Sequence, residues 1–158
     1  MRTEFRKVDV SRELRSLIAF DHKVFSPPDW FDPRAWRQYE SYWLLLGSRK
    51  IGCCAFEKHA DFRDDLGQEN PAMKGSLYIA STGILPAFQG KGFGSFMKSW
   101  QVAYARRHKF RRMVTNTRKR NLAMIGLNKK FGFRVVRTTR GYYFDPTDST
   151  VVMERMLL

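Results

Sequence analysis

Seven short runs along the chain are rich in apolar and β-branched residues and are bounded by turn-forming residues, which predicts β-strands. Two of these runs flank Gly47-Ser48-Arg49-Lys50 and therefore predict a hairpin. The seven predicted strands are residues 3–10, 42–46, 51–59, 76–85, 111–117, 133–139 and 150–157.

Four further segments repeat their apolar residues at spacings of three and four, or open with residues that favour a helix start. Ser11 is predicted to cap the first helix, and Pro27-Pro28 should end it because paired prolines cannot continue a helix. Asp32 and Pro33 predict the start of the second helix. The four predicted helices are residues 11–25, 32–41, 92–104 and 121–132.

The predicted elements follow the order β-α-α-β-β-β-α-β-α-β-β, which is typical of an α/β domain built around a mixed sheet. The polar segment 60–75 contains Gly67, Pro71 and Gly75 and is predicted to be a loop between strands. At 158 residues the chain is long enough to form one domain with its own core. We therefore expect a single domain over residues 1–158.

Gly90, Gly92 and Gly94 occupy alternate positions between the strand at 76–85 and the helix that follows. Glycine permits positive φ, and it lets another group approach the backbone because it has no Cβ. The following helix begins with unpaired N–H groups and the positive end of its dipole, and Lys91 adds a cation. The turn is therefore predicted to bind an anion.

Two common phosphate-binding motifs do not fit this turn. The phosphate loop fails because Gly92 follows Lys91, and the dinucleotide fingerprint fails because its last glycine is Ser95 here. The segment Gln89–Gly94 instead matches the pattern Q/R-x-x-G-x-G/A. In this segment the sequence resembles the GNAT superfamily of acyl-CoA N-acyltransferases, which bind the coenzyme A pyrophosphate there.

A second signature supports this resemblance. Residues 121–133 are similar to the family pattern N-x-x-A/S-x-x-L-Y-x-x-x-G-F, with Asn121, Leu127, Gly132 and Phe133 in place. The resemblance implies a mixed, mostly antiparallel sheet flanked by about four helices, with strands that splay at the coenzyme A site. It also implies acetyl transfer from acetyl-CoA to a primary amine by direct attack, without a metal. The residues implied to contact acetyl-CoA are Thr82, Gly83, Ile84, Gln89, Gly90, Lys91, Gly92, Phe93, Gly94, Ser95 and Asn121.

One position departs from the family pattern. Where members often have a tyrosine that protonates the leaving thiolate, this chain has Asn128. An amide cannot act as an acid at neutral pH, so we expect no proton donor at this position. A thiol with a pKa near ~8.5 still leaves tolerably well as a thiolate.

Tyr78 is the first candidate for the group that receives the proton of the amine, because related enzymes often place their base early on this strand. It lies six residues before Ile84, so strand alternation puts both on one face. Tyrosine has an ordinary pKa near ~10 and needs perturbation or a water relay to serve as a base. Tyr78 is alternatively a plain sheet aromatic, and Glu57 and His59 are the reserve candidates.

Aromatic residues in two other segments resemble the substrate loops of protein N-terminal acetyltransferases. Tyr142 and Tyr143 lie between the last two strands, and Phe25 lies where the first helix ends. The resemblance implies that these three residues hold a peptide near its free amine. Tyrosines are also common in ordinary hairpins.

The net charge of +14 is the main compositional feature, and much of it lies in residues 106–120. A basic surface attracts polyanions, which leaves open a ribosome- or nucleic-acid-binding module on a degenerate fold. The departure at Asn128 also leaves open a non-catalytic coenzyme A sensor. Among acceptors, the charge favours a protein or peptide over cationic small amines.

The two cysteines, Cys53 and Cys54, are adjacent on a predicted strand and are expected to be ordinary packing residues. Two cysteines cannot form a zinc site alone, and their use fits a reducing compartment. The N-terminal residues 1–14 show no apolar core of a signal peptide, and no segment reaches the ~20 apolar residues of a membrane span. We therefore expect a cytoplasmic protein without membrane contact, either a monomer or a homodimer.

Overall fold

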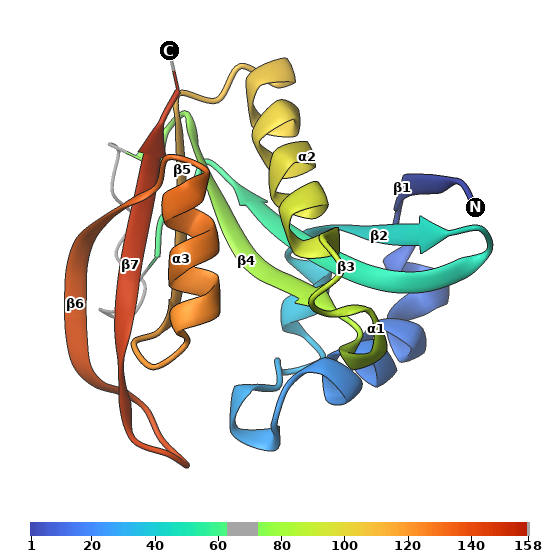
Figure 1. The fold of residues 1–158 in the computed structure, drawn as a ribbon, viewed down its shortest axis with the longest axis horizontal. Coiled ribbons are helices and arrows are strands. Elements are labelled where there is room, and N and C mark those ends of the chain that lie inside the picture. The colour runs from blue at the N-terminus through green and yellow to red at the C-terminus, as the bar shows by residue number, and fades with distance from the viewer. Residues whose placement is uncertain (63–72, 158) are drawn as a thin grey trace. The chain divides into compact units, whose positions relative to one another are not determined.

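The computed structural model describes residues 1–62 and 73–157 and contains an α/β fold with three α-helices and seven strands in these residues (Figure 1). Of the predicted loop 60–75, residues 63–72 lie outside the described part. The strands are β1 (Thr3–Lys7), β2 (Glu40–Leu46), β3 (Arg49–Lys58), β4 (Ser76–Ile84), β5 (Arg112–Arg118), β6 (Arg134–Tyr143) and β7 (Asp148–Met156). The α-helices are α1 (Val10–Val24), α2 (Phe93–Arg107) and α3 (Leu122–Lys130).

The second predicted helix is wrong. Residues 32–41 contain only a short 3₁₀ turn, Ala35–Arg37, and β2 begins at Glu40. The side chain of Asp32 accepts the backbone N–H of Arg34 at 2.8 Å, as at a helix start, but only one short turn follows before the chain enters β2. Four helices were predicted, and the described residues contain three α-helices.

The start of α1 also differs from the prediction. The residue that precedes the helix is Asp9 and not Ser11, whose hydroxyl donates to Asp9 at 2.6 Å. The Asp9 backbone N–H is accepted by Glu13 at 2.9 Å, so a carboxylate in the first turn stabilises this end. The helix ends at Val24, before the two prolines, as predicted.

The strand order is β1-β2-β3-β4-β5-β7-β6, a mixed and mostly antiparallel sheet, as expected. Contacts divide the chain into two compact units. The first contains Met1–Glu57 and Ala80–Met97, and the second contains Lys58–Ile79 and Lys98–Leu158.

In the first unit, β1, β2 and β3 pair antiparallel in succession, with an irregularity at Leu44/Leu45. The apolar side of α1 covers this ladder through Leu17 and Phe20, whose ring contacts Trp43 at 5.6 Å. Cys53 belongs to the same core cluster. Both cysteines are buried and neither is in a disulfide with a described residue, which confirms their prediction as packing residues.

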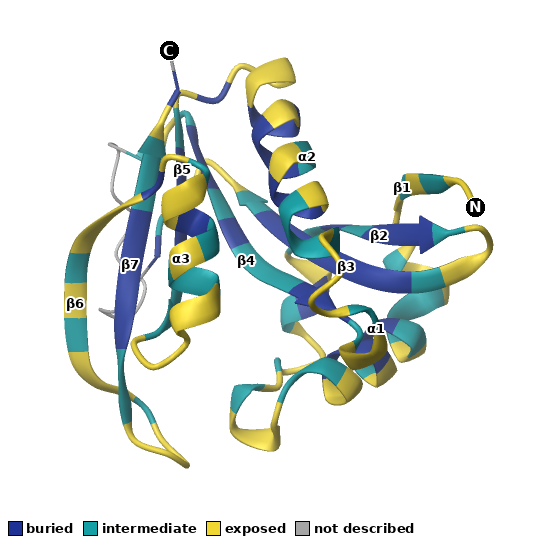
Figure 2. Ribbon diagram, in the orientation of Figure 1, coloured by how far each residue is buried: buried dark blue, intermediate teal, exposed yellow. Residues whose placement is uncertain are grey.

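In the second unit, β5 and β7 pair antiparallel along their length, from Arg112↔Met156 to Arg118↔Thr150. The central residues of β7 are buried, whereas β6 is exposed or half-buried along its length (Figure 2). The parallel pairing of β4 with β5 runs from Ser76↔Arg112 to Ile79↔Thr115. Within the described residues this ladder ends at Ile79, although β4 continues to Ile84.

No helix in the described residues has both the length and the apolar character that crossing a membrane requires.

Candidate active site

The turn between β4 and α2 has the backbone that its glycines predict. Gly90 and Gly92 have φ of +74° and +88°, and a Cβ at either position would meet no described atom within 4 Å. The N–H of Phe96 bonds the carbonyl of Gly92 at 3.0 Å, so the three preceding N–H groups of α2 have no helical acceptor. Gly94 lies within the first turn of α2, inside the helix predicted from residue 92. The result is an open surface with backbone donors.

Cations lie beside this turn around the ring of Phe88. The guanidinium carbon of Arg49 is 4.9 Å from the ring centroid, and the ammonium of Lys91 is 5.7 Å from it. The ring of Phe93 meets Phe88 edge-on at 6.0 Å. The first turn of α2 contains no acidic residue. Arg49 was not predicted, since only the folded hairpin brings it close to a turn forty residues later.

Two predicted cofactor residues have structural contacts of their own. The side-chain amide of Gln89 donates to the carbonyl of Ile84 at 3.0 Å, which ties the turn to the end of β4. A Cβ on Gly83 would lie 3.2 Å from Val24 and 3.3 Å from Phe20, so glycine allows α1 to approach β4. The remaining predicted cofactor residues of this unit lie on β4 (Thr82) and in the first turn of α2 (Ser95).

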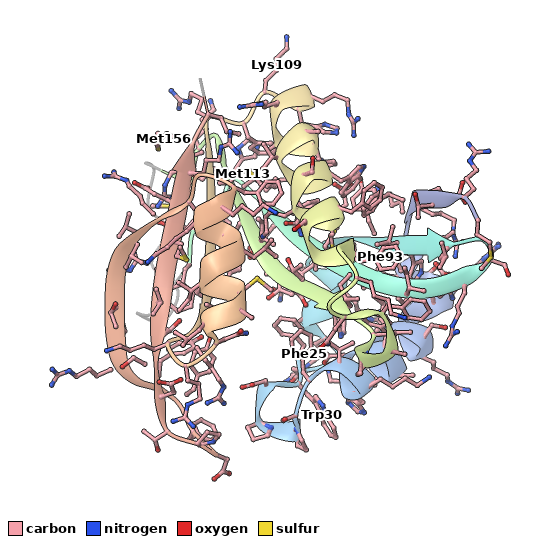
Figure 3. All side chains as sticks on the ribbon, viewed as in Figure 1. Phe25, Trp30, Phe93, Lys109, Met113 and Met156 are labelled. Carbon is pink, nitrogen blue, oxygen red and sulfur yellow. The ribbon has the colours of Figure 1, made fainter. Side chains whose placement is uncertain are left out.

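The segment after α1 is closed by Asp21. Its backbone carbonyl accepts the N–H of Phe25 at 2.9 Å, and its carboxylate accepts the N–H of Phe31 at 3.0 Å. The indole of Trp30 donates to the carbonyl of Phe25 at 2.8 Å; both side chains are labelled in Figure 3. Asp21 is 2% exposed, and burial raises the pKa of its carboxyl. Phe25 is thereby held 3.5 Å from the position of a Cβ on Gly83.

The second unit brings two predicted site residues together. The hydroxyl of Tyr78 donates to the side-chain oxygen of Asn116 on β5. The amide nitrogen of Asn116 donates to the hydroxyl of Tyr143 at 3.0 Å and to that of Thr150 at 3.2 Å. One amide therefore connects the predicted catalytic tyrosine with a predicted substrate tyrosine. Asn116 was not predicted.

Aromatic and cationic groups extend this cluster. Tyr142 meets the ring of Tyr143 at 4.8 Å and that of Phe62 at 5.1 Å, both edge-on. The guanidinium of Arg118 lies 4.5 Å from the centroid of Tyr143 and donates to two hairpin carbonyls, at 2.6 and 3.1 Å. Arg137 donates to the carbonyl of Phe62 at 2.7 Å. The rings of Tyr142 and Tyr143 are thus packed against these neighbours.

The direction of the Tyr78 hydrogen bond limits its chemistry. The phenol proton points to a neutral amide oxygen, which cannot take that proton at neutral pH. In this arrangement the phenol oxygen can act toward a further group only as an acceptor. The arrangement therefore suits the binding of an amine N–H more than the donation of a proton to a thiolate.

Asn121 and Asn128 lie at the two ends of α3. Asn121 caps α3 by accepting the N–H of Met124 at 3.1 Å. Asn128 is fully buried, and its amide nitrogen lies 3.7 Å from the sulfur of Met153. Its amide oxygen has no hydrogen-bond partner among the described residues. Position 128, where the family often has a tyrosine, is therefore part of the core in this chain.

The two reserve base candidates lie in different units of the chain. His59 has a φ of +54°, and its Nδ1 accepts the N–H of Gly75 at 3.0 Å, which closes a turn. Glu57 lies near the end of β3, in the other unit. In residues 1–62 and 73–157, no three His, Cys, Asp or Glu side chains gather as a metal site would require.

The model of the acetyltransferase (GNAT) family matches residues 11–133 of the chain. The chain belongs to this family. Membership places the protein among the acyltransferases and confirms the resemblance found in the glycine turn. No protein of curated function matches this GNAT protein by sequence.

Solved structures show the same fold at low sequence identity. The ribosomal-protein-S18-alanine N-acetyltransferase from Escherichia coli is 13% identical with a TM-score of 0.79, over 98% of this chain and 94% of that one. The loading GNATL domain of CurA from Lyngbya majuscula is 15% identical with a TM-score of 0.82, over 99% and 98%. The structure of yncA from Salmonella typhimurium with its cofactor acetyl-CoA is 20% identical with a TM-score of 0.76, over 100% and 95%.

Proposed function

We propose that this GNAT protein transfers an acetyl group from acetyl-CoA to the α-amine of a protein or peptide, and that residues 1–158 form its single catalytic domain. The observation that carries the proposal is the hydrogen-bonded chain Tyr78–Asn116–Tyr143, which connects a candidate catalytic group with a candidate substrate group. Fold similarity to a ribosomal-protein-alanine N-acetyltransferase is consistent with it.

The glycine turn fits the pyrophosphate of acetyl-CoA. The space above Gly90 and Gly92 is open, the first N–H groups of α2 are unpaired within the helix, and Lys91 and Arg49 supply positive charge. Bound acetyl-CoA would supply an acetyl group activated as a thioester. In this proposal Gln89 acts indirectly, by holding the turn against β4.

At the acceptor end, Tyr78 binds an N–H of the amine through its phenol oxygen. Asn116 fixes this orientation, because it accepts the phenol proton on one side and donates to Tyr143 and Thr150 on the other. The amine nitrogen attacks the acetyl carbon, the carbon–sulfur bond breaks, and the thiolate leaves. The excess proton of the amine passes to water.

The weakness of this base favours an α-amine over a lysine side chain. An α-amine has an ordinary pKa near ~7.8, and a lysine side chain has one near ~10.4. At neutral pH, deprotonation therefore requires about 3.5 kcal/mol less for an α-amine than for a lysine. A phenol that already donates its proton to an amide gives no strong base to offset this difference. A substrate that deprotonates readily therefore suits the site.

The test compares acetylation of two peptides of the same sequence, one with a free α-amine and one with a blocked α-amine and a single lysine. We expect the α-amine peptide to react at least tenfold faster at pH 7, and the ratio to fall as pH rises toward 10, because lysine then becomes neutral. Preference for the lysine peptide at every pH would contradict the substrate assignment.

Two other outcomes would replace the proposal. Acetyl-CoA binding without turnover on any amine would assign the chain to a coenzyme A sensor. RNA binding without any coenzyme A binding would assign it to a nucleic-acid-binding module, as the net charge of +14 allows.

A further inference from the structure

One face of α2 borders a hollow of about 440 Å³ in the second unit. The helix contributes Ser99, Val102, Ala103 and Arg106, which recur at the spacing of one helical face. Phe131 at the end of α3 and Arg155 on β7 complete the lining. A hollow of this size suits a small molecule. None of its six residues belongs to the predicted cofactor or acceptor residues.

Two guanidinium groups meet at this hollow without a carboxylate. Arg155 donates to the carbonyl of Phe131 through Nη1 at 2.7 Å, which fixes the side chain and leaves its Nε and Nη2 donors for another acceptor. Burial, followed by the charge of Arg106, lowers the pKa of Arg155. Neither arginine forms an ion pair within the described residues, and no lining residue is acidic.

The surroundings of Arg155 differ from those of Arg112, another partly buried arginine of the same unit. Arg112 is paired with Asp61 at 3.1 Å and with Glu154 at 2.7 Å, so its burial is balanced by two carboxylates. Arg155 has no such balance, and the positive charge of Arg106 acts against its own. A bound anion would supply the missing charge.

We propose that this hollow binds a phosphate monoester with an apolar body, held by Arg106 and Arg155. Two guanidinium groups match the charge of a phosphate monoester, which is close to −2 near neutral pH, and each presents parallel donors to its oxygens. Val102, Ala103 and Phe131 give the apolar body a surface to contact, and Ser99 adds one hydroxyl. A carboxylate would neutralise only one of the two guanidinium groups.

The test is a calorimetric titration of the full chain with three probes: phenyl phosphate, inorganic phosphate and benzoate. We expect phenyl phosphate to bind at least tenfold more tightly than the other two. Arg106→Gln and Arg155→Gln should each weaken it at least tenfold, and Ala103→Trp should abolish binding by filling the hollow. Arg107→Gln is the matched control, because it removes a neighbouring charge that does not line the hollow. Circular dichroism checks that each variant is folded.

The titrations are repeated with saturating coenzyme A, since phosphate groups can also occupy the glycine turn. The losses in the Arg106 and Arg155 variants should be the same in both series. Equal binding of phenyl phosphate and inorganic phosphate would overturn the proposal. An equal loss in Arg107→Gln, or no binding of phenyl phosphate to the wild-type chain, would overturn it as well.

Discussion

Tyr78 donates its phenol proton to the side-chain oxygen of Asn116, a residue 38 positions later in the sequence. Replacing Tyr78 with phenylalanine keeps the ring, which belongs to the packing around Phe62, and removes only the hydroxyl. We expect the acetylation rate to fall by about 10²-fold or more and the alkaline limb of the pH–rate profile to move. Coenzyme A affinity should be unchanged. An unaltered rate and profile would return Tyr78 to a purely structural role.

Tyr142 and Tyr143 should affect substrate affinity rather than the chemical step. Phenylalanine at either position should raise KM for the peptide and leave kcat within a few fold, provided that chemistry is slow relative to substrate release. Tyr143→Phe should also lower the free energy of unfolding by about 1 kcal/mol, because it removes the hydroxyl that accepts from Asn116. A kcat loss in both variants with unchanged KM would contradict this division.

Gly92 should be required for coenzyme A binding because a side chain there would clash with the ligand and not with the protein. A Cβ at this position meets no described atom, so it would occupy the space proposed for the pyrophosphate. We expect Gly92→Val to weaken binding over tenfold, or about 1.4 kcal/mol. Gly141→Val controls for backbone strain, because Gly141 also has positive φ and open surroundings. Calorimetry that finds equal losses in the two variants would contradict the site.

Asn128 should contribute to neither proton transfer nor stability. Its oxygen is buried without a hydrogen-bond partner among the described residues, so Asn128→Leu replaces a desolvated polar atom with an apolar group of similar size. We expect the free energy of unfolding to rise by about 1 kcal/mol in urea titrations. Asn128→Ala should keep the maximal rate within a few fold. A hundredfold loss with intact coenzyme A binding would show that the amide takes part in catalysis.

Asp21 should make stability depend on pH. Burial raises its folded-state pKa above the ordinary 3.8, so the folded chain holds this proton more tightly than the unfolded chain. Its contribution to stability is therefore complete below pH 3.8 and declines as pH rises through the folded pKa. Asp21→Asn keeps an acceptor for Phe31 and should remove this decline, which makes the variant more stable than wild type at pH 7. The free energies of unfolding of wild type and Asp21→Asn are measured from pH 3 to 7. A difference between them that stays constant over this range would contradict the assignment.

Local patterns predicted most of the fold. Apolar residues such as Phe93, Met97 and Trp100 recur at helical spacing and fix α2, and the glycine turn before it follows from backbone geometry. The helix predicted at 32–41 failed because the chain pairs with β3 from Glu40 onward, opposite Phe56, which leaves room for only a short turn after Asp32. Patterns of short range cannot detect such competition.

The acceptor side of the site could be predicted only in part. Tyr78 was predicted from its position on a strand and Tyr143 from the segment between the last two predicted strands, and both stay predictions. Asn116 carries no signal in the sequence, because its three partners come from β4, β6 and β7. Arg155 was missed for the same reason, since its meeting with Arg106 depends on how β7 and α2 pack. The surroundings of Asn116 and of Arg155 both depend on contacts between residues far apart in the sequence.

The thiols of Cys53 and Cys54 can report local unfolding on the two sides of β3. Adjacent residues on a strand face opposite sides, and both thiols are buried, 3% and 0% exposed. A thiol reagent can reach either sulfur only when the packing on that side of β3 is released. In variants that keep only one of the two cysteines, the rate of reaction with a disulfide reagent under native conditions would therefore report how often that side of β3 unfolds locally.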